Sequence, residues 1–119
     1  MDLTTEALRL GITMSRVRAE VASENIANAN VPGSLARGVD FSQAAGLLHQ
    51  AEMDPDMDLG RLRDVTPRSL SATVHALDGG TNLDGEVADM EAAGADFQAL
   101  TTVMSRRFAL MQLAMAGRD

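Results

Sequence analysis

The chain has no cysteine, tryptophan or tyrosine, and only three of its 119 residues are phenylalanine. The absence of cysteine excludes disulfide bonds and thiolate chemistry. With so few aromatic residues, a core must be built from leucine, valine, alanine and the eight methionines, which pack adaptably. A chain of this length buries only about two-thirds of its unfolded surface, so we expect one modest domain. These features argue against a large enzyme cleft.

Positive charge is also scarce. There is no lysine, and the ten arginines are outnumbered by seventeen acidic residues, which gives a formal net charge of −7. This balance argues against a general nucleic-acid binder and favours a protein partner. No stretch approaches the roughly 20 apolar residues of a membrane span. Asp2 and Glu6 stand where a secretory signal peptide would carry positive charge, so we expect any export to proceed without a cleaved signal peptide.

The first thirty residues predict a long helix, in the range 1–30. Apolar residues recur there at alternating spacings of four and three, which places them on one helix face as a heptad seam. The seam consists of Leu3, Ala7, Leu10, Met14, Val17 and Val21. The charged residues of this segment lie off the seam, as expected of a face that meets solvent or a partner: Arg9, Arg16, Arg18, Glu20 and Glu24.

The predicted helix ends in the stretch SENIANANVPGSLARGVDF, Ser23 to Phe41. Asn28 and Asn30 lower helix propensity and are suited to bond backbone groups freed at the helix end, or act only as helix terminators. Pro32 then disfavours helical geometry in the preceding residue. Residues 31–34, Val-Pro-Gly-Ser, predict a type II turn, because Pro32 presets one central residue and Gly33 accepts the positive φ of the other.

Residues 84–119 predict a second long helix with its own heptad seam. The seam consists of Met90, Gly94, Phe97, Thr101, Met104, Phe108, Met111 and Met115, and further apolar residues beside it widen the face. Such a face needs more than one neighbouring helix, so its methionines serve either as hairpin core or as an adaptable partner-binding groove. Acids at the start and arginines at Arg106, Arg107 and Arg118 follow the order that the helix dipole favours, and Gly117 is a plausible terminator.

The middle of the chain, residues 31–83, differs in kind. The window from Glu52 to Glu91 contains ten acidic residues and three arginines. Its net charge of −7 equals the formal net charge of the whole chain. Asp40 and Phe41 precede an apolar pattern that predicts one short capped helix, and Leu70 to Ala76 alternate as a strand would. The sequence therefore predicts one structural unit that is mainly α-helical. Long N- and C-terminal helices pack as an antiparallel coiled-coil hairpin, with an irregular or extended middle segment.

The sequence contains only weak candidates for a metal-binding or catalytic site. Asp54, Asp56, Asp58 and Gly60 resemble the start of a calcium loop, but Val65 stands where a bidentate glutamate is needed, so a solvated acidic loop is the better interpretation. His49 and His75 belong to no metal-binding spacing, and no motif positions a serine nucleophile. Arg106 and Arg107 either bind an anion or, more simply, are solvent-exposed residues near the helix C-terminus that complement the helix dipole. We therefore expect no enzyme activity, catalytic residue, metal or cofactor.

The segment ASENIANANVPGSLARGVDF resembles the signature of the bacterial flagellar axial proteins, in which an N-terminal helix ends in an Ala-Asn-x-x-Thr-Pro-Gly-aromatic segment. LDGEVADME, Leu83 to Glu91, is similar to the segment that opens the C-terminal helix of proximal-rod members. Val31 replaces the usual threonine and Ser34 the usual aromatic. The motif residues that match include Asn25, Ala27, Asn28, Pro32, Gly33, Arg37, Asp40 and Phe41.

This resemblance implies a structural subunit of the flagellar proximal rod, exported unfolded through the flagellar type III apparatus and assembled in the periplasm. Its partners would be copies of itself, other rod subunits, and the membrane-ring, rod-adaptor and export-gate proteins of the basal body. The middle segment would reach neighbouring subunits. Two alternatives remain open: another axial protein of the proximal rod, or a coiled-coil adaptor unrelated to flagella.

Overall fold

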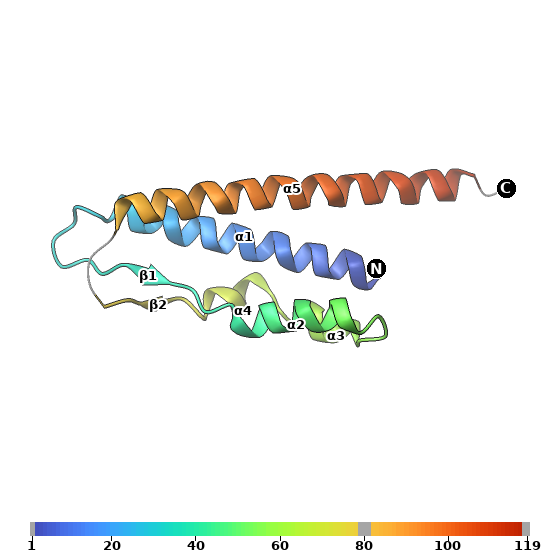
Figure 1. Ribbon diagram of the computed structural model, residues 1–119, viewed down its shortest axis with the longest axis horizontal. Helices are drawn as coiled ribbons and strands as arrows, with labels where there is room; N and C mark the ends of the chain where they lie inside the picture. The colour runs from blue at the N-terminus through green and yellow to red at the C-terminus, as the bar shows by residue number, and fades with distance from the viewer. Residues whose placement is uncertain (1, 79–81, 118–119) are drawn as a thin grey trace.

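The protein is an elongated rod of 65 × 24 × 21 Å in a computed structural model that describes residues 2–78 and 82–117. Figure 1 shows two long helices side by side, with the remaining elements in a layer along the opposite side of the first helix. The prediction of a mainly helical chain with a packed pair of long helices is confirmed. In chain order the elements are α1 (Leu3–Ala27), β1 (Arg37–Gly38), α2 (Ser42–Met53), α3 (Leu59–Arg63), α4 (Pro67–Ser71), β2 (His75–Ala76) and α5 (Leu83–Ala116).

Helix α1 begins and ends close to where the sequence predicts. The Asp2 side chain caps its first turn by accepting a hydrogen bond from the Thr5 amide at 2.9 Å. The helix ends at Ala27 with Asn28 as its C-cap, and Gly33 follows with a φ of +79°. The Ser34 amide donates to the Val31 carbonyl at 3.1 Å, so the turn over residues 31–34 has the hydrogen bond and the positive φ expected of type II.

Helix α5 is the longest element, with 34 residues. It starts one residue earlier than predicted, because Asn82 accepts a hydrogen bond from the Gly85 amide and so caps the helix. Acidic residues occupy its first turn as expected, but its last turn, which ends at Ala116, carries no basic residue. Arg106 and Arg107 thus lie well before the end of α5, and Arg118 lies outside the described residues.

The middle segment is irregular but more helical than expected. It contains the predicted α2, and also α3 and α4, which the sequence analysis missed. The predicted strand from Leu70 to Ala76 is wrong in its first part: Thr66 and Ser69 form a reciprocal capping box that starts α4, and only His75–Ala76 is extended. These two residues pair antiparallel with β1, Arg37 opposite Ala76.

The hydrophobic core lies between α1 and the middle segment. The predicted seam of α1 supplies Leu10, Val17 and Val21 to this core, with Leu3, Ala7 and Met14 packed beside them. The middle segment supplies the other buried members of the cluster, Phe41, Ala44, Leu47, Met57, Leu62 and Leu70. The members named for this core come from α1 and the middle segment and include no residue of α5, so the α1 seam packs largely against the middle segment.

Helix α1 meets α5 through a different face, which carries small and polar residues. Three contacts define an antiparallel register: Thr5 accepts a hydrogen bond from Arg107, Gly11 lies against Leu100, and Asn25 bonds Glu86. A Cβ atom added at Gly11 would stand 3.2 Å from a methyl carbon of Leu100, so this glycine permits close approach of the two helices. In this register the start of α1 lies beside Arg107 and Phe108.

Candidate assembly interface

Helix α5 leaves most of its apolar face uncovered. Among the described residues of α5, Ala93 is the only one that is fully buried. Within its predicted seam, Met104 is half-buried, while Met90, Phe97, Phe108, Met111 and Met115 are all exposed. Monomeric proteins rarely expose such a continuous apolar strip unless it binds something. Met90, Met111 and Met115 are therefore surface residues, and only Met104 is partly covered within the chain.

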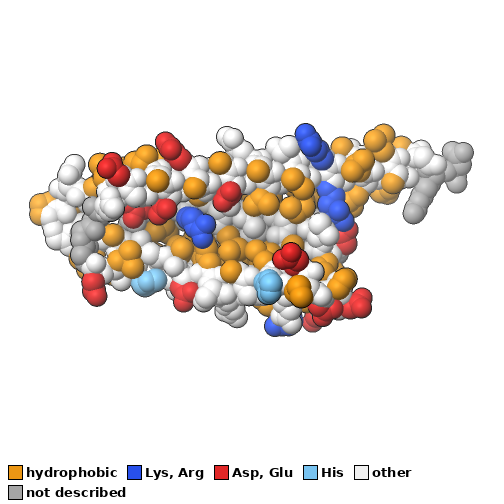
Figure 2. Space-filling view, viewed as in Figure 1, with side chains coloured by type: hydrophobic (Ala, Val, Ile, Leu, Met, Phe, Trp, Pro, Cys, Tyr) orange, Lys and Arg blue, Asp and Glu red, His pale blue; other side chains and the backbone are white. Residues whose placement is uncertain are grey.

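The end of α5 extends beyond the start of α1. Figure 1 shows this overhang at the C-terminal end, and in the register above it comprises residues 109–116. Three of its large apolar side chains are the most exposed of the helix: Leu110 at 66%, Leu113 at 70% and Met115 at 71%. Figure 2 shows hydrophobic side chains over this end, with arginine side chains close by. The overhang is thus a single apolar helix end without a partner in the described chain.

A groove runs between α1 and α5 nearer their other ends. It has a volume of about 690 Å³. Its α1 side carries Ser15, Ala19 and Ser23, spaced four residues apart, and small side chains at this spacing leave a hollow along one helix face. Gly94 lies on the α5 side, where Met90 and Phe97 also line the groove. The ion pair of Arg16 with Glu20, at 3.3 Å, is at its edge.

Arg107 joins the two long helices at the start of α1. Its guanidinium donates to the Thr5 hydroxyl at 3.1 Å and to the Asp2 carboxylate. The Thr5 amide and Arg107 together lower the pKa of Asp2 from 3.8 to about 2. The interpretation of Arg107 as part of a solvated helix finish is therefore wrong, because it ties α5 to the N-terminal cap of α1.

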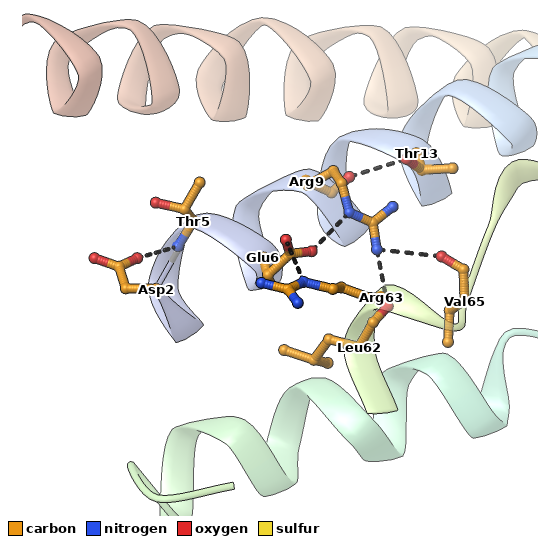
Figure 3. A network of polar contacts seen from close by, with 8 residues as sticks. All are labelled: Asp2, Thr5, Glu6, Arg9, Thr13, Leu62, Arg63 and Val65. Carbon is orange, nitrogen blue, oxygen red and sulfur yellow. Dashed lines mark hydrogen bonds and ion pairs between the residues drawn. The ribbon is translucent and has the colours of Figure 1, made fainter. Parts of the chain in front are cut away.

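A buried carboxylate anchors the middle segment to α1 (Figure 3). Glu6 accepts hydrogen bonds from Arg9 at 3.0 Å and from Arg63 at 3.3 Å. Burial alone would raise the pKa of Glu6, but the bonds from the two guanidinium groups outweigh it, and the pKa is lowered. Arg9 also donates to the carbonyls of Leu62 and Val65, at 2.8 and 3.2 Å. Arg9 was expected on a solvent- or partner-facing side and instead holds the end of α3.

Asn25 is the most connected residue of the predicted turn motif. Its side-chain amide donates to the Arg37 carbonyl at 2.8 Å and to Glu86 at 3.0 Å, and its side-chain oxygen accepts from the Arg37 amide at 2.9 Å. It is only 3% exposed. Sequence reasoning placed the hydrogen-bonding role on Asn28 and Asn30, whereas this asparagine, one turn earlier, joins α1 to β1 and α5.

The other motif residues serve the turn and the start of α2. Ala27 ends α1, Asn28 is its C-cap, and Pro32 and Gly33 form the turn. Asp40 accepts hydrogen bonds from the Ser42 hydroxyl at 2.7 Å and the Ser42 amide at 3.1 Å, which lower its pKa. Phe41 is buried in the core, and the Arg18 guanidinium lies 5.6 Å from its ring centre.

The residues considered above as calcium or metal ligands do not come together in a metal site within the described ranges. Asp54 accepts from the Asp56 amide, and Asp58 caps α3 by accepting from the Gly60 amide. His49 lies on α2 and His75 on β2, and both are exposed. In residues 2–78 and 82–117, no group of three or more His, Cys, Asp or Glu side chains is arranged to hold a metal ion.

A polar hollow of about 500 Å³ lies among α2, α3 and α4. Several of its polar side chains are already bonded within the chain: Asp40 to Ser42, the Ser69 hydroxyl to the Thr66 carbonyl, and the Thr73 hydroxyl to the Leu70 carbonyl at 2.7 Å. These groups therefore serve as caps and turn bonds for the local backbone.

A scan against protein-family models found no match for this chain, and searches of curated proteins and of solved structures found no similar protein either. The resemblance to flagellar axial proteins therefore rests on the motif residues alone. In the described ranges, none of the helices has the combined length and apolarity needed to cross a lipid bilayer.

Proposed function

We propose that this chain is a structural subunit of the bacterial flagellar proximal rod, which assembles when neighbouring subunits cover the exposed face of α5. One observation carries the proposal. The 34-residue α5 has an apolar face from Val87 to Met115 that stays exposed after the rest of the chain has folded. Exposed apolar surface of this extent favours association, because burying it removes hydrocarbon from water.

The two long helices suit this role differently. The seam of α1 is used within the chain, in the core with the middle segment. The α5 face is available to other molecules and is rich in methionine, which adapts to neighbours that are related but not identical. Partners in the rod would be copies of this chain, sister rod subunits, and the ring, adaptor and export-gate proteins of the basal body. The proposal places the chain in the periplasmic part of the basal body.

The motif residues support the choice of the rod over other helical assemblies. Asn25 joins the end of α1 to β1 and α5 while Gly33 reverses the chain, so the Asn-Pro-Gly segment fixes how the middle segment returns along α1. A general coiled-coil adaptor needs only the heptads and gives this segment no special role.

Deleting the gene from its bacterial host tests the proposal. We expect loss of swimming, with basal bodies that lack a rod, and recovery of both when the gene is restored. Normal swimming after deletion would overturn the rod function and favour the adaptor. A chain that restores swimming but is absent from purified basal bodies would contradict its role as a structural subunit.

A further inference from the structure

We propose that the overhang of α5, residues 109–116, docks into the α1–α5 groove of a second copy of this chain, so that copies add head to tail. This inference rests on the proposed assembly function and deepens it by naming the two surfaces that meet. The groove is the hollow lined by Ser15, Ala19 and Ser23 on one side and by Met90, Gly94 and Phe97 on the other.

The shapes of the two surfaces match. The overhang is a single helix with large side chains, and Leu110 and Leu113 are spaced three residues apart, so they lie on one side of it. The groove has small residues between half-exposed Met90 and Phe97, which leaves space for large side chains to insert. This is the relation of knobs to holes through which helices pack.

Charge favours the same pairing. The parts of α1 and α5 around the groove, residues 15–27 and 83–97, carry seven carboxylates and two arginines. Beyond Asp96, by contrast, α5 has Arg106 and Arg107 and no acid as far as Ala116. Arg107 is already paired with Asp2 of its own chain, so Arg106 is the positive group of this end that remains for the acidic groove of another copy, and its attraction to that groove favours head-to-tail contact.

The overhang and the groove of one copy cannot meet each other. Both lie on the same helix α5, and Leu113 is nineteen residues from Gly94, or about 28 Å along the axis at 1.5 Å per residue. The occupant of the groove must therefore come from another molecule. Because the two surfaces differ, the contact is heterologous and leaves a free overhang and a free groove at the ends, so copies can continue to add at steps of about 28 Å.

Single-cysteine variants test this pairing, since the chain has no cysteine of its own. Gly94→Cys places a thiol in the groove, where a Cβ meets no atom within 4 Å, and Leu113→Cys places one on the overhang. We expect a short thiol cross-linker to join these two variants when they are mixed. The matched control pairs Leu113→Cys with Ala99→Cys, which is exposed on the side of α5 away from the groove residues Met90, Gly94 and Phe97.

A second variant separates docking from folding. Leu113→Asp alters a residue that is 70% exposed, so it leaves thermal unfolding of the monomer unchanged. It should weaken self-association by roughly ten-fold or more in sedimentation, because it places a charge in an apolar contact.

The outcomes distinguish this inference from the proposed function. Cross-linking of the groove pair well above the control pair, together with weaker association of Leu113→Asp, supports head-to-tail docking. Polymers that form with equal cross-linking of both pairs overturn the docking and leave the rod function standing. A purified chain that stays monomeric, while its gene is still needed for swimming, also overturns docking between copies and leaves sister subunits as the partners. Normal swimming without the gene overturns both.

Discussion

The two long helices carry similar apolar heptads but have different surroundings. Helix α1 lies between α5 and the middle segment, and its seam residues Leu10, Val17 and Val21 are buried. Helix α5 touches α1 along one narrow side, and only Ala93 is buried among its described residues. A heptad pattern therefore identifies a face that requires cover but does not identify the element that covers it. In α1 that element belongs to the chain, and in α5 we propose that it belongs to a neighbour.

The largest difference in stability is expected when the same substitution, leucine to alanine, is made on each of the two long helices. Leu10→Ala should lower the free energy of unfolding by about 3 kcal/mol, because Leu10 is fully buried and the change leaves a cavity. Leu113→Ala should change it by less than about 0.5 kcal/mol, because that side chain is 70% exposed. Urea denaturation of the monomer measures both. Equal losses from the two substitutions would mean that α5 has cover in the isolated chain.

A smaller effect is expected where α1 holds the middle segment. Glu6→Ala removes the acceptor of Arg9 and Arg63 and should cost about 2 kcal/mol, the scale of a hydrogen bond to a charged group. The control is Glu20→Ala, whose ion pair with Arg16 is exposed on both sides and should cost less than about 0.5 kcal/mol. Thermal unfolding of the two variants compares them. A loss for Glu6→Ala no larger than for the control would show that the middle segment does not depend on this anchor.

The smallest effect concerns the bond between the ends of the two long helices. The pKa of Asp2 is lowered from 3.8 to about 2 by the Thr5 amide and by Arg107. Its contribution to stability is therefore complete above pH 4 and is lost as the pH falls toward 2. Asp2→Asn removes this dependence but retains the lowered pKa of Glu6, so the difference between the two proteins isolates Asp2.

Urea denaturation at pH 5 and pH 2.5 measures that difference. The original chain should lose more stability over this range than Asp2→Asn does. Identical losses would show that neither the Thr5 amide nor Arg107 holds the Asp2 carboxylate in solution.

Local patterns were sufficient to predict some elements from the sequence. Spacing of apolar residues located α1 and α5, and the Pro32-Gly33 pair predicted the turn with its positive φ. The helices α3 and α4 were missed because each has only five residues, too few for a helical period to be visible. The alternation from Leu70 to Ala76 suggested a strand, but the Thr66–Ser69 capping box determined the local structure.

The interface could be predicted only in part. Exposure of the α5 face followed from its width, since one helix cannot cover it. The roles of Arg9, Arg107 and Asn25 depend on partners that are between 12 and 105 residues away along the chain. Hydrophobic periodicity contains no information on such polar contacts. The sequence predicted for Asn28 and Asn30 only a local role, as backbone bonds at the helix end or as terminators, and gave no sign that Asn25 bonds Arg37 and Glu86.

The bonds of Asn25 also protect the edge of the small sheet. Both the amide and the carbonyl of Arg37 in β1 are occupied by the Asn25 side chain, at 2.9 and 2.8 Å. An unpaired strand edge is a template for further strands and so for aggregation. Here a single side chain takes the place of the next strand, so at Arg37 the ribbon cannot recruit another chain. If copies assemble as proposed, this protection at Arg37 disfavours β-aggregation between them.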